Sequence, residues 1–392
     1  MCFSGVIIIM NKNKITKILA DDKIPFLKGV LDPFVEIVYL DPSNINKVTV
    51  YDKDALIIRT RTKCNSELLE GSKIRFIATA TIGFDHIDTE YCKSKNIKWI
   101  NAPGCNSSSV MQYMASALLK IAYKKNINLD EKTIGIIGVG NVGRKVARLA
   151  KILGLNVLLN DPPRMRVEGN AGFVNLDELI NKSDIITFHV PLIRGGIDNT
   201  YHMADEIFFK RFHNKKLLIN TSRGEVIKTS DLKNAVKNKT IDGCILDVWE
   251  NEPIIDKELL NIIDIATPHI AGYSADGKAN GTSVCVNNIN SFFKLGLKED
   301  WYPHEIPLPQ KPEHFNINCS DKLYQQIIYD IISYTYDIAE DDKLLRKSPS
   351  TFEKQRSDYP VRREFAFYKI NLENGDKKIK NNLTKLGFKI TN

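Results

Sequence analysis

The sequence lacks both an apolar run long enough to cross a membrane and a cysteine framework. No stretch approaches the roughly 18 consecutive apolar residues that a transmembrane helix needs. The apolar run at residues 6–10 has neither a basic start nor a small-residue cleavage site, so we expect no signal peptide. The seven cysteines are scattered without a C-x-x-C pair, which argues against a disulfide scaffold and against a zinc site. We therefore expect reduced thiols, no metal and a cytoplasmic location.

The sequence also lacks a strong local excess of either charge. It carries 55 Lys and Arg against 47 Asp and Glu, a formal net charge of +8 at pH 7. These charges are mixed along the chain and form no basic block interleaved with aromatic residues. We therefore expect neither a nucleic-acid partner nor a membrane partner. With 392 residues and 43% hydrophobic content, the chain has the size and composition of a globular protein of two or three domains.

What the sequence does contain is a glycine-rich turn between a strand pattern and a helix pattern. Gly138, Gly140 and Gly143 form G-x-G-x-x-G directly after a strongly apolar run. Such a turn lets a pyrophosphate approach the backbone at the start of a helix. A second apolar run, 156–160, ends at Asp161, where the fingerprint places a carboxylate that binds ribose hydroxyls. The glycines alone match many ordinary loops, but the strand, helix, strand and acid together predict a dinucleotide site.

The identity of the acid bears on which dinucleotide binds. Asp161 favours NAD over NADP, because its negative charge would repel a 2′-phosphate. Arg164 follows closely enough in the sequence to weaken that preference a little. We therefore expect NAD as the cofactor.

Alternating strand and helix patterns extend through most of the chain and predict an α/β fold. Before the fingerprint, helical segments separate apolar runs at 15–19, 37–40, 55–58, 74–79 and 97–100. After it, runs at 185–189, 217–220, 244–247 and 263–266 predict a doubly wound parallel sheet. The serines at 107–109 are expected to cap a long helix that leads into this sheet. The predicted domains are an α/β domain (1–103 with 272–300), a Rossmann NAD-binding domain (104–271) and a C-terminal domain (301–392).

Three ionisable residues stand at predicted strand ends, where ligands bind in such sheets. They are Arg223, Glu252 and His269. Oxidation of a 2-hydroxy acid needs a cation for the carboxylate, a base for the hydroxyl proton and an acid that orients that base. Taken singly, each residue has an ordinary reading as a surface cation, a helix N-terminal acid or a loop histidine. Their joint occurrence after a nucleotide fingerprint favours the catalytic interpretation.

These motifs together resemble the D-isomer-specific 2-hydroxyacid dehydrogenases. The resemblance rests on the stretches 138–143, 220–224, 247–253 and 268–272. Narrower likeness at 78–86, 102–106, 159–164 and 269–274, and in the tail at 341–347 and 359–365, points to one branch of that family. That branch oxidises 4-phospho-D-erythronate with NAD on the route to pyridoxal 5′-phosphate. The resemblance implies a flavodoxin-like substrate domain, a small α+β C-terminal dimerisation domain and hence a homodimer.

Site roles carry over where the motif residues match. The resemblance implies that Arg223, Glu252 and His269 are catalytic, with His269 as the proton acceptor in oxidation. It implies cofactor contacts at Gly138, Gly140, Asn141, Val142, Gly143, Asp161, Val190, Thr221, Ser222, Arg223, Asp247 and Gly272. It implies substrate contacts at Thr60, Thr81 and Tyr273.

The expected substrate carries a carboxylate at one end and a phosphate at the other. Arg59 and Lys63 are candidate phosphate ligands, Arg61 is a weaker one, and the alternative is an exposed charge cluster at a strand end. Two rival functions stay open at this point. One is another D-2-hydroxyacid dehydrogenase, for example one acting on 3-phosphoglycerate, and the other is a non-catalytic protein that senses NAD.

Overall fold

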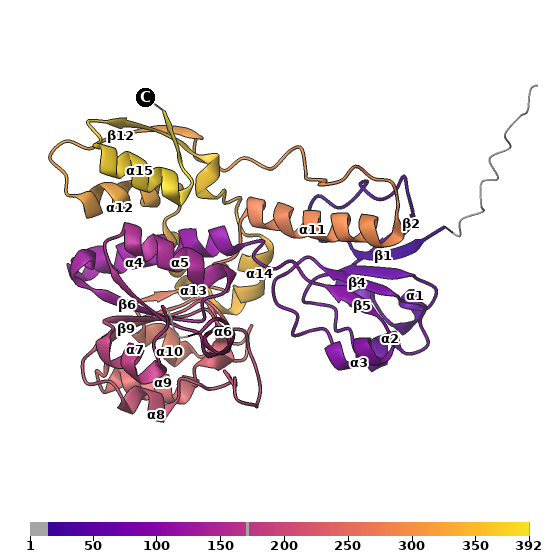
Figure 1. The fold of residues 1–392 in the computed structure, drawn as a ribbon, viewed down its shortest axis with the longest axis horizontal. Coiled ribbons are helices and arrows are strands. Elements are labelled where there is room, and N and C mark those ends of the chain that lie inside the picture. Colours follow the sequence, from indigo (N-terminus) through magenta and orange to yellow (C-terminus); the bar gives the residue numbers. More distant parts are fainter. Residues whose placement is uncertain (1–14, 170–171, 392) are drawn as a thin grey trace, which may run out of the picture. The chain divides into compact units, whose positions relative to one another are not determined.

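The computed structural model describes residues 15–169 and 172–391, so the apolar run at 6–10 lies outside the described residues. The described residues form two compact units (Figure 1). One combines the described part of Met1–Pro103 with Lys278–His304. The other combines the described parts of Gly104–Gly277 and Glu305–Asn392.

The first unit is a five-stranded parallel sheet with helices on both faces. Its strands lie in the order β2-β1-β3-β4-β5, which is the flavodoxin-like order that the resemblance implied. Their bounds are β1 Lys17–Asp21, β2 Glu36–Leu40, β3 Ala55–Ile58, β4 Phe76–Thr79 and β5 Lys98–Ile100. One face packs on α11 (Ala275–Phe293). The other packs on α1 (Lys47–Val50), α2 (Ser66–Leu69) and α3 (Thr89–Ser94).

The second unit contains the predicted doubly wound sheet, with six parallel strands in the order β11-β10-β9-β8-β6-β7. The strand order reverses at β6, which has β7 on one side and β8 on the other. Such a reversal opens a crevice at the carboxyl ends of the strands, and ligands of open α/β sheets bind there. The bounds are β6 Thr133–Ile137, β7 Asn156–Asn160, β8 Ile185–Phe188, β9 Lys216–Asn220, β10 Ile241–Leu246 and β11 Ile265–Ala266.

Helices cover both faces of this sheet (Figure 1). One apolar cluster joins the sheet to α4 (Ser107–Lys125) and α5 (Asn141–Ile152). A second cluster joins the opposite face to α7 (Leu176–Lys182), α8 (Glu206–Lys210), α9 (Thr229–Lys237) and α10 (Lys257–Ile262). A short helix, α6 (Pro162–Glu168), follows β7. The carboxyl edge of the sheet is therefore held rigidly from both sides.

The C-terminal segment adds a three-stranded parallel sheet, β12-β13-β14, and four helices. Its core is continuous with that of α4 and α5, because the same apolar cluster contains residues of α4, α12, β13 and α15. The small domain of strands and helices predicted for the tail is thus present, and it shares a core with the nucleotide-binding sheet. The bounds are β12 His314–Asn318, α12 Tyr324–Thr335, α13 Ile338–Lys347, α14 Phe352–Ser357, β13 Lys369–Glu373, α15 Lys377–Leu386 and β14 Lys389–Thr391.

The start of α4 differs from the prediction. The residue that precedes its first turn is Asn106, and none of its side-chain atoms caps the helix. Ser107 Oγ donates instead to the carbonyl of Gly104 at 2.7 Å, and Ser109 Oγ donates to Glu364 at 2.8 Å. The prediction that serines 107–109 cap this helix was wrong, because Ser109 is recruited by a carboxylate of the tail.

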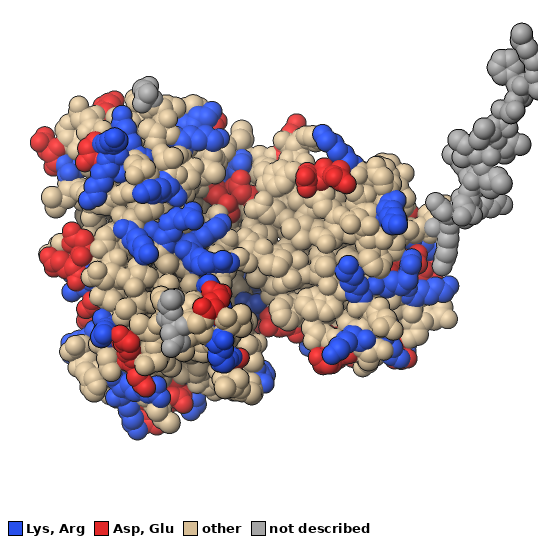
Figure 2. Space-filling view, viewed as in Figure 1, with Lys and Arg blue, Asp and Glu red and all other residues tan. Residues whose placement is uncertain are grey.

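Charges of both signs are spread over the face shown in Figure 2. A group of cations nevertheless gathers over α5, where Arg144, Arg148 and Lys151 are exposed. Within residues 15–169 and 172–391, no helix is long and apolar enough to cross a membrane.

Candidate active site

The three predicted catalytic residues follow three neighbouring strands. Arg223 comes after β9, Glu252 after β10 and His269 after β11, and these strands are paired in parallel in that order. Their carboxyl ends therefore meet at one edge of the sheet. The glycine turn after β6 opens at the same edge. The topology thus assembles the residues that the sequence places far apart.

His269 and Glu252 form a direct pair. The Nδ1 atom of His269 lies 2.7 Å from Oε2 of Glu252, and the other carboxylate oxygen, Oε1, accepts the backbone N–H of Trp249 at 2.9 Å. Burial acts to raise the pKa of Glu252, but the charge of His269 and the hydrogen bonds from His269 and Trp249 outweigh it, so this pKa lies below its usual value. Glu252 is consequently ionised at neutral pH. It fixes Nδ1 as the protonated ring nitrogen, which leaves Nε2 to accept a proton.

The loop that carries Arg223 is held by a buried asparagine. Asn220 accepts the N–H and hydroxyl of Ser222 through Oδ1, at 3.0 and 2.8 Å, and donates to the carbonyl of Arg223 at 2.8 Å. The next residue, Gly224, lies against the backbone of the Glu252 loop. A Cβ at Gly224 would come within 1.9 Å of the carbonyl carbon of Trp249. Only glycine therefore permits the Arg223 loop and the Glu252 loop to pack together.

Asp247 organises the loop on which His269 stands. Its side chain is 1% exposed, and one oxygen accepts Thr267 Oγ1 and the N–H of Ile270 at 2.7 and 2.8 Å. The second oxygen accepts the N–H of Ala271 at 2.9 Å, and the Asp247 carbonyl accepts the N–H of His269 at 2.6 Å. Asp247 was expected to contact NAD. Both of its carboxylate oxygens bind the loop that carries His269, and the expected NAD contact stays a prediction.

The glycine turn has the shape that a dinucleotide needs. A Cβ at Gly143 would lie 2.0 Å from the carbonyl oxygen of Gly138, so this glycine allows α5 to begin directly under the turn. A Cβ at Gly140 would instead meet no atom within 4 Å, which leaves open space above the first turn of α5. Oδ2 of Asp161 accepts the N–H of Val139 at 2.8 Å, which places the carboxylate beside the turn. The residues present therefore fit a bound NAD.

Arg164 does not favour NADP in this arrangement. Its Nε and Nη2 atoms bind the carboxylate of Glu168 at 2.7 and 2.6 Å, and Nη1 donates to the carbonyl of Val139 at 2.6 Å. The guanidinium is therefore engaged by its own helix α6 and by the turn.

His189 is a residue of this edge that is not among the predicted site residues. Its Nδ1 lies 3.2 Å from Oγ1 of Thr221, a predicted NAD contact, and its Nε2 lies 3.0 Å from Oγ1 of Thr187. Burial lowers the pKa of His189 to about 3, so the ring is neutral at physiological pH. It orients the Thr221 hydroxyl without introducing a charge. A histidine directly after a buried strand, next to the glycine turn, was the available sequence signal.

Four predicted substrate residues lie in the first unit. Thr81 Oγ1 is 2.8 Å from Oγ1 of Thr79 and donates to the carbonyl of Gly83 at 3.0 Å. Arg59 forms a bidentate pair with the buried carboxylate of Asp21, at 2.8 and 3.0 Å, so its charge is already shared. Thr60 and Lys63 are exposed.

Tyr273, the remaining predicted substrate contact, lies in the second unit beside the tail. Its ring is 5.9 Å from the ring of Tyr359, edge to face, and the guanidinium carbon of Arg356 lies 5.7 Å from its ring centroid. The charge of Arg356 also contributes to lowering the pKa of Glu252. The tail therefore contacts the loop that carries His269. The local sequence of neither segment reveals this contact.

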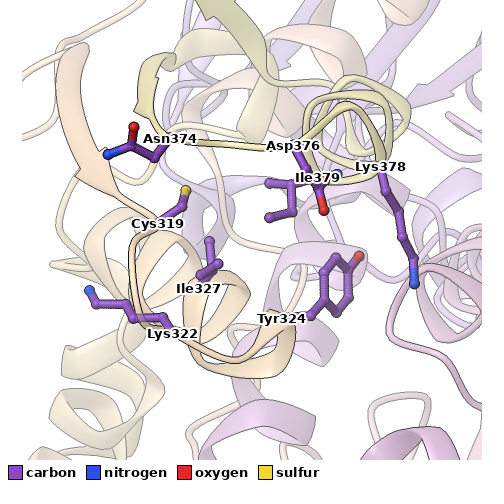
Figure 3. Close-up of a pocket in the computed structure, with 8 residues that line it drawn as sticks. All are labelled: Cys319, Lys322, Tyr324, Ile327, Asn374, Asp376, Lys378 and Ile379. Atoms are coloured by element: carbon purple, nitrogen blue, oxygen red, sulfur yellow. Dashed lines mark hydrogen bonds between the residues drawn. The ribbon is translucent and has the colours of Figure 1, made fainter.

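A pocket of the tail has no part in this arrangement. It is lined by Cys319, Lys322, Tyr324, Ile327, Asn374, Asp376, Lys378 and Ile379 (Figure 3). It contains none of the predicted site residues. Across residues 15–169 and 172–391, no group of three or more His, Cys, Asp or Glu side chains could hold a metal ion.

Sequence comparisons place the chain among known proteins. Residues 112–271 match the D-isomer specific 2-hydroxyacid dehydrogenase, NAD binding domain, and residues 308–387 match a domain of unknown function. The chain is 50% identical over 355 residues to erythronate-4-phosphate dehydrogenase of Bacteroides thetaiotaomicron, covering 90% of this chain and 99% of that protein. It is 37% identical over 375 residues to the erythronate-4-phosphate dehydrogenase of Escherichia coli O157:H7, covering 95% of this chain and 98% of the relative.

Solved structures share the fold of most of the chain. D-Lactate dehydrogenase from Aquifex aeolicus, complexed with NAD and lactic acid, superposes with a TM-score of 0.58 at 26% identity, covering 71% of this chain and 96% of that one. NAD-bound 3-phosphoglycerate dehydrogenase of Entamoeba histolytica gives a TM-score of 0.60 at 22% identity, covering 73% and 98%.

Proposed function

Because the chain belongs to the D-isomer-specific 2-hydroxyacid dehydrogenases and, within them, to the erythronate-4-phosphate dehydrogenases, we propose that it oxidises 4-phospho-D-erythronate at C2. The product is (R)-3-hydroxy-2-oxo-4-phosphooxybutanoate, on the route to pyridoxal 5′-phosphate. The chain is an NAD-dependent enzyme. The observation that carries the proposed chemistry is the 2.7 Å pair of His269 and Glu252 at the carboxyl edge of the NAD-binding sheet.

His269 is the proton acceptor in this reaction. Its Nδ1–H donates to the Glu252 carboxylate, so Nε2 takes the proton of the C2 hydroxyl as the C2–H bond breaks. NAD supplies the acceptor for the hydride that leaves C2. The ionised Glu252 stabilises the imidazolium that forms. In the reverse direction the same Nε2–H returns the proton to the 2-oxo group.

Arg223 holds the carboxylate of the substrate. A guanidinium presents two parallel N–H donors, which match a carboxylate and the neighbouring C2 oxygen. Asn220 and Gly224 fix the backbone on both sides of Arg223, so its reach is set by the loop. This cation stabilises the negative charge that develops on the C2 oxygen in the transition state, and so lowers the barrier in both directions.

NAD is bound at the glycine turn and the strand ends that follow it. We assign the pyrophosphate to the turn at Gly138, Gly140 and Gly143 and to the first residues of α5, Asn141 and Val142. We assign the adenosine ribose to Asp161. The remaining proposed contacts are Val190, Thr221, Ser222, Arg223, Asp247 and Gly272. The exposed cations of α5 give this part of the surface a positive potential, which attracts an anionic cofactor and an anionic substrate (Figure 2).

We propose that the hydroxyls of Thr60 and Thr81 contact the substrate and that the cations of Lys63 and Arg59 bind its phosphate. The pairing of Arg59 with Asp21 reduces its net charge, so we expect Lys63 to contribute more to phosphate binding. Tyr273 completes the proposed substrate contacts from the second unit.

One assay tests the proposed function against its rivals. NADH formation is followed at 340 nm with 4-phosphoerythronate, 3-phosphoglycerate and D-lactate offered separately, in the presence of a ketone-trapping agent. Preference for 4-phosphoerythronate supports the proposal. Preference for another acid keeps the chemistry and replaces the substrate. Tight NADH binding without turnover of any of the three would point to an NAD sensor.

We further propose that the chain forms a homodimer through its tail and works in the cytoplasm. The tail exposes several large apolar side chains, including Leu323 at 82% and Leu308 at 72%, and such side chains favour association. Light scattering on the intact protein should give twice the chain mass of 44.5 kDa, and a mass of one chain would contradict the dimer. The six cysteines in the described part of the chain are free thiols, the state that a reducing compartment maintains.

A further inference from the structure

The loop that carries His269, residues 267–273, is called the catalytic loop. Two buried charged residues, Asp247 and Arg362, bind its backbone. Asp247 accepts the N–H groups of Ile270 and Ala271, as described above. Nη2 of Arg362 donates to the carbonyls of the same two residues, Ile270 and Ala271, at 3.1 and 2.7 Å. Arg362 belongs to the tail, yet it touches the segment between the catalytic base His269 and the proposed ligand residues Gly272 and Tyr273.

Arg362 is itself held rigidly. It is 5% exposed, and its guanidinium carbon lies 4.5 Å from the ring centroid of Tyr336 and 5.7 Å from that of Tyr359. The hydroxyls of these two tyrosines both donate to Oδ2 of Asp341, at 2.8 and 2.9 Å. The arginine therefore stands against two aromatic rings of the tail. Nη2 is the atom that binds the His269 loop, whereas Nε and Nη1 are buried without a hydrogen-bond partner among the described residues.

The residues around Arg362 extend the same attachment. The carbonyl of Arg362 accepts the N–H of Ala275 at 2.9 Å. Arg363 pairs with the carboxylate of Asp276 at 3.0 Å, and the carboxylate of Glu364 accepts the hydroxyl of Ser274 at 3.0 Å. The tail thus contacts the chain continuously from Ile270 to Asp276.

We infer that Arg362 is a positioning residue for the dehydrogenase reaction: it fixes the backbone that places His269 and Tyr273, although it touches neither substrate nor cofactor. This inference rests on the proposed function. The physical reason is that a proton acceptor must lie within hydrogen-bond reach of the C2 hydroxyl, and a misplacement of about 1 Å can cost two orders of magnitude in rate. If the carbonyls of Ile270 and Ala271 lose the Arg362 donor, they are left unpaired in the protein interior, and the loop can then shift to find other partners.

A matched control exists in the same tail. Arg346 also donates to two carbonyls of the nucleotide-binding sheet region, those of Leu260 and Ile263, at 2.5 and 3.0 Å. Neither carbonyl belongs to the catalytic loop. Arg346 also pairs with the carboxylate of Asp342 at 2.9 Å, so Arg346→Met removes an ion pair in addition. Both variants remove hydrogen bonds from an arginine to two carbonyls, and only Arg362→Met removes them from residues 270 and 271.

The experiment measures kcat with 4-phosphoerythronate, NADH binding by fluorescence and hydrogen exchange in the intact protein. Arg362→Met is expected to lower kcat by about 10- to 100-fold, to leave the NADH Kd within about threefold and to speed amide exchange at residues 267–273. Arg346→Met is expected to keep kcat within about twofold of the wild-type value, even if it lowers Tm by as much as Arg362→Met does. Arg362→Lys retains the charge and one donor nitrogen, so it should recover part of the lost kcat.

Several outcomes would overturn the inference. Wild-type kcat and wild-type exchange at residues 267–273 in Arg362→Met would do so, as would equal kcat losses in Arg362→Met and Arg346→Met. If Arg362→Met does not fold, Arg362→Lys decides, and an unchanged kcat and exchange pattern in that variant would refute the assignment. Absence of turnover in the wild-type protein would instead contradict the proposed function, while the exchange measurement would still test the role of Arg362.

Discussion

Nδ1 of His269 lies 2.7 Å from a Glu252 oxygen whose partner oxygen accepts the N–H of Trp249. The carboxylate is therefore fixed by its own loop before it fixes the imidazole. The same protein contains a second such pair, in which Nε2 of His202 lies 2.6 Å from Oε1 of Glu250. That pair offers an internal comparison of the same chemistry, because neither His202 nor Glu250 belongs to the proposed site, although Glu250 stands two positions before Glu252 on the same loop.

Replacement of the catalytic histidine should separate chemistry from cofactor binding. His269→Ala removes the proton acceptor, so kcat should fall by about 10²- to 10⁴-fold, while NADH binding at the glycine turn persists. Steady-state kinetics and fluorescence titration measure the two effects. His202→Ala is the control, and its kcat should stay near that of the wild type. An undiminished kcat in His269→Ala would refute the assigned role.

The lowered pKa of Glu252 predicts a pH dependence of stability. A carboxylate whose pKa is depressed in the folded protein stabilises the fold above its unfolded pKa, and this contribution disappears as the pH falls through the folded value. Glu252→Gln should therefore lower Tm relative to the wild type at pH 7, and the difference should narrow below a pH of about 4.5. Thermal melts across this pH range measure it. A difference that stays constant down to pH 3 would argue against an ionised Glu252 in the folded protein.

The choice between NAD and NADP should depend on Asp161. Asp161→Ala removes the ribose carboxylate and the charge that repels a 2′-phosphate, so we expect KM for NAD to rise by about 10-fold and the preference for NAD over NADP to shrink. Titration of both cofactors measures the change. Glu178→Ala is a matched control, since it removes a carboxylate that pairs with exposed Lys182 on α7. An equal change in the control would indicate a general charge effect.

Replacement by alanine should have different effects at Gly140 and Gly224. At Gly140 a Cβ meets open space, so Gly140→Ala should fold normally and weaken NAD binding, because the methyl group occupies the approach of the pyrophosphate. At Gly224 a Cβ would overlap the backbone of Trp249, so Gly224→Ala should destabilise the protein by about 1–3 kcal/mol or more. Thermal melts and NADH titration distinguish the two. Normal stability in Gly224→Ala would contradict the close packing of the two loops.

Much of this architecture could be predicted from local patterns. The glycine turn, the apolar runs and Asp161 are contiguous signals, and they gave the sheet and its cofactor edge. The pairing of His269 with Glu252 was also predictable, because residues at the ends of adjacent parallel strands converge. The comparisons confirmed the family that these motifs indicated. The predicted domain limits and individual ligand contacts remain predictions.

Other features depend on contacts between distant segments and leave no local signature. Ser109 looked like a helix cap, but its partner Glu364 lies 255 positions away. Arg362 reads as one basic residue in a mixed-charge tail, and only the folded chain shows that it binds carbonyls beside His269. The predicted NAD contact at Asp247 stays a prediction, and only the fold shows that its buried carboxylate also accepts backbone N–H groups of the His269 loop. In each case the sequence indicates the residue type, and tertiary structure decides its partner.

The apolar core that α4 shares with the tail makes the tail part of the same folding unit as the nucleotide-binding sheet. Ser116 of α4 donates to the carbonyl of Tyr336 at 3.0 Å, and the ring of Tyr113 lies 6.3 Å from that of Tyr336. A truncation before β12 would expose this face of α4 to water and remove Arg362 in the same event. In this chain folding and turnover are then expected to fail together. A substitution that loosens the tail should therefore be felt at the loop of His269 as well as in Tm.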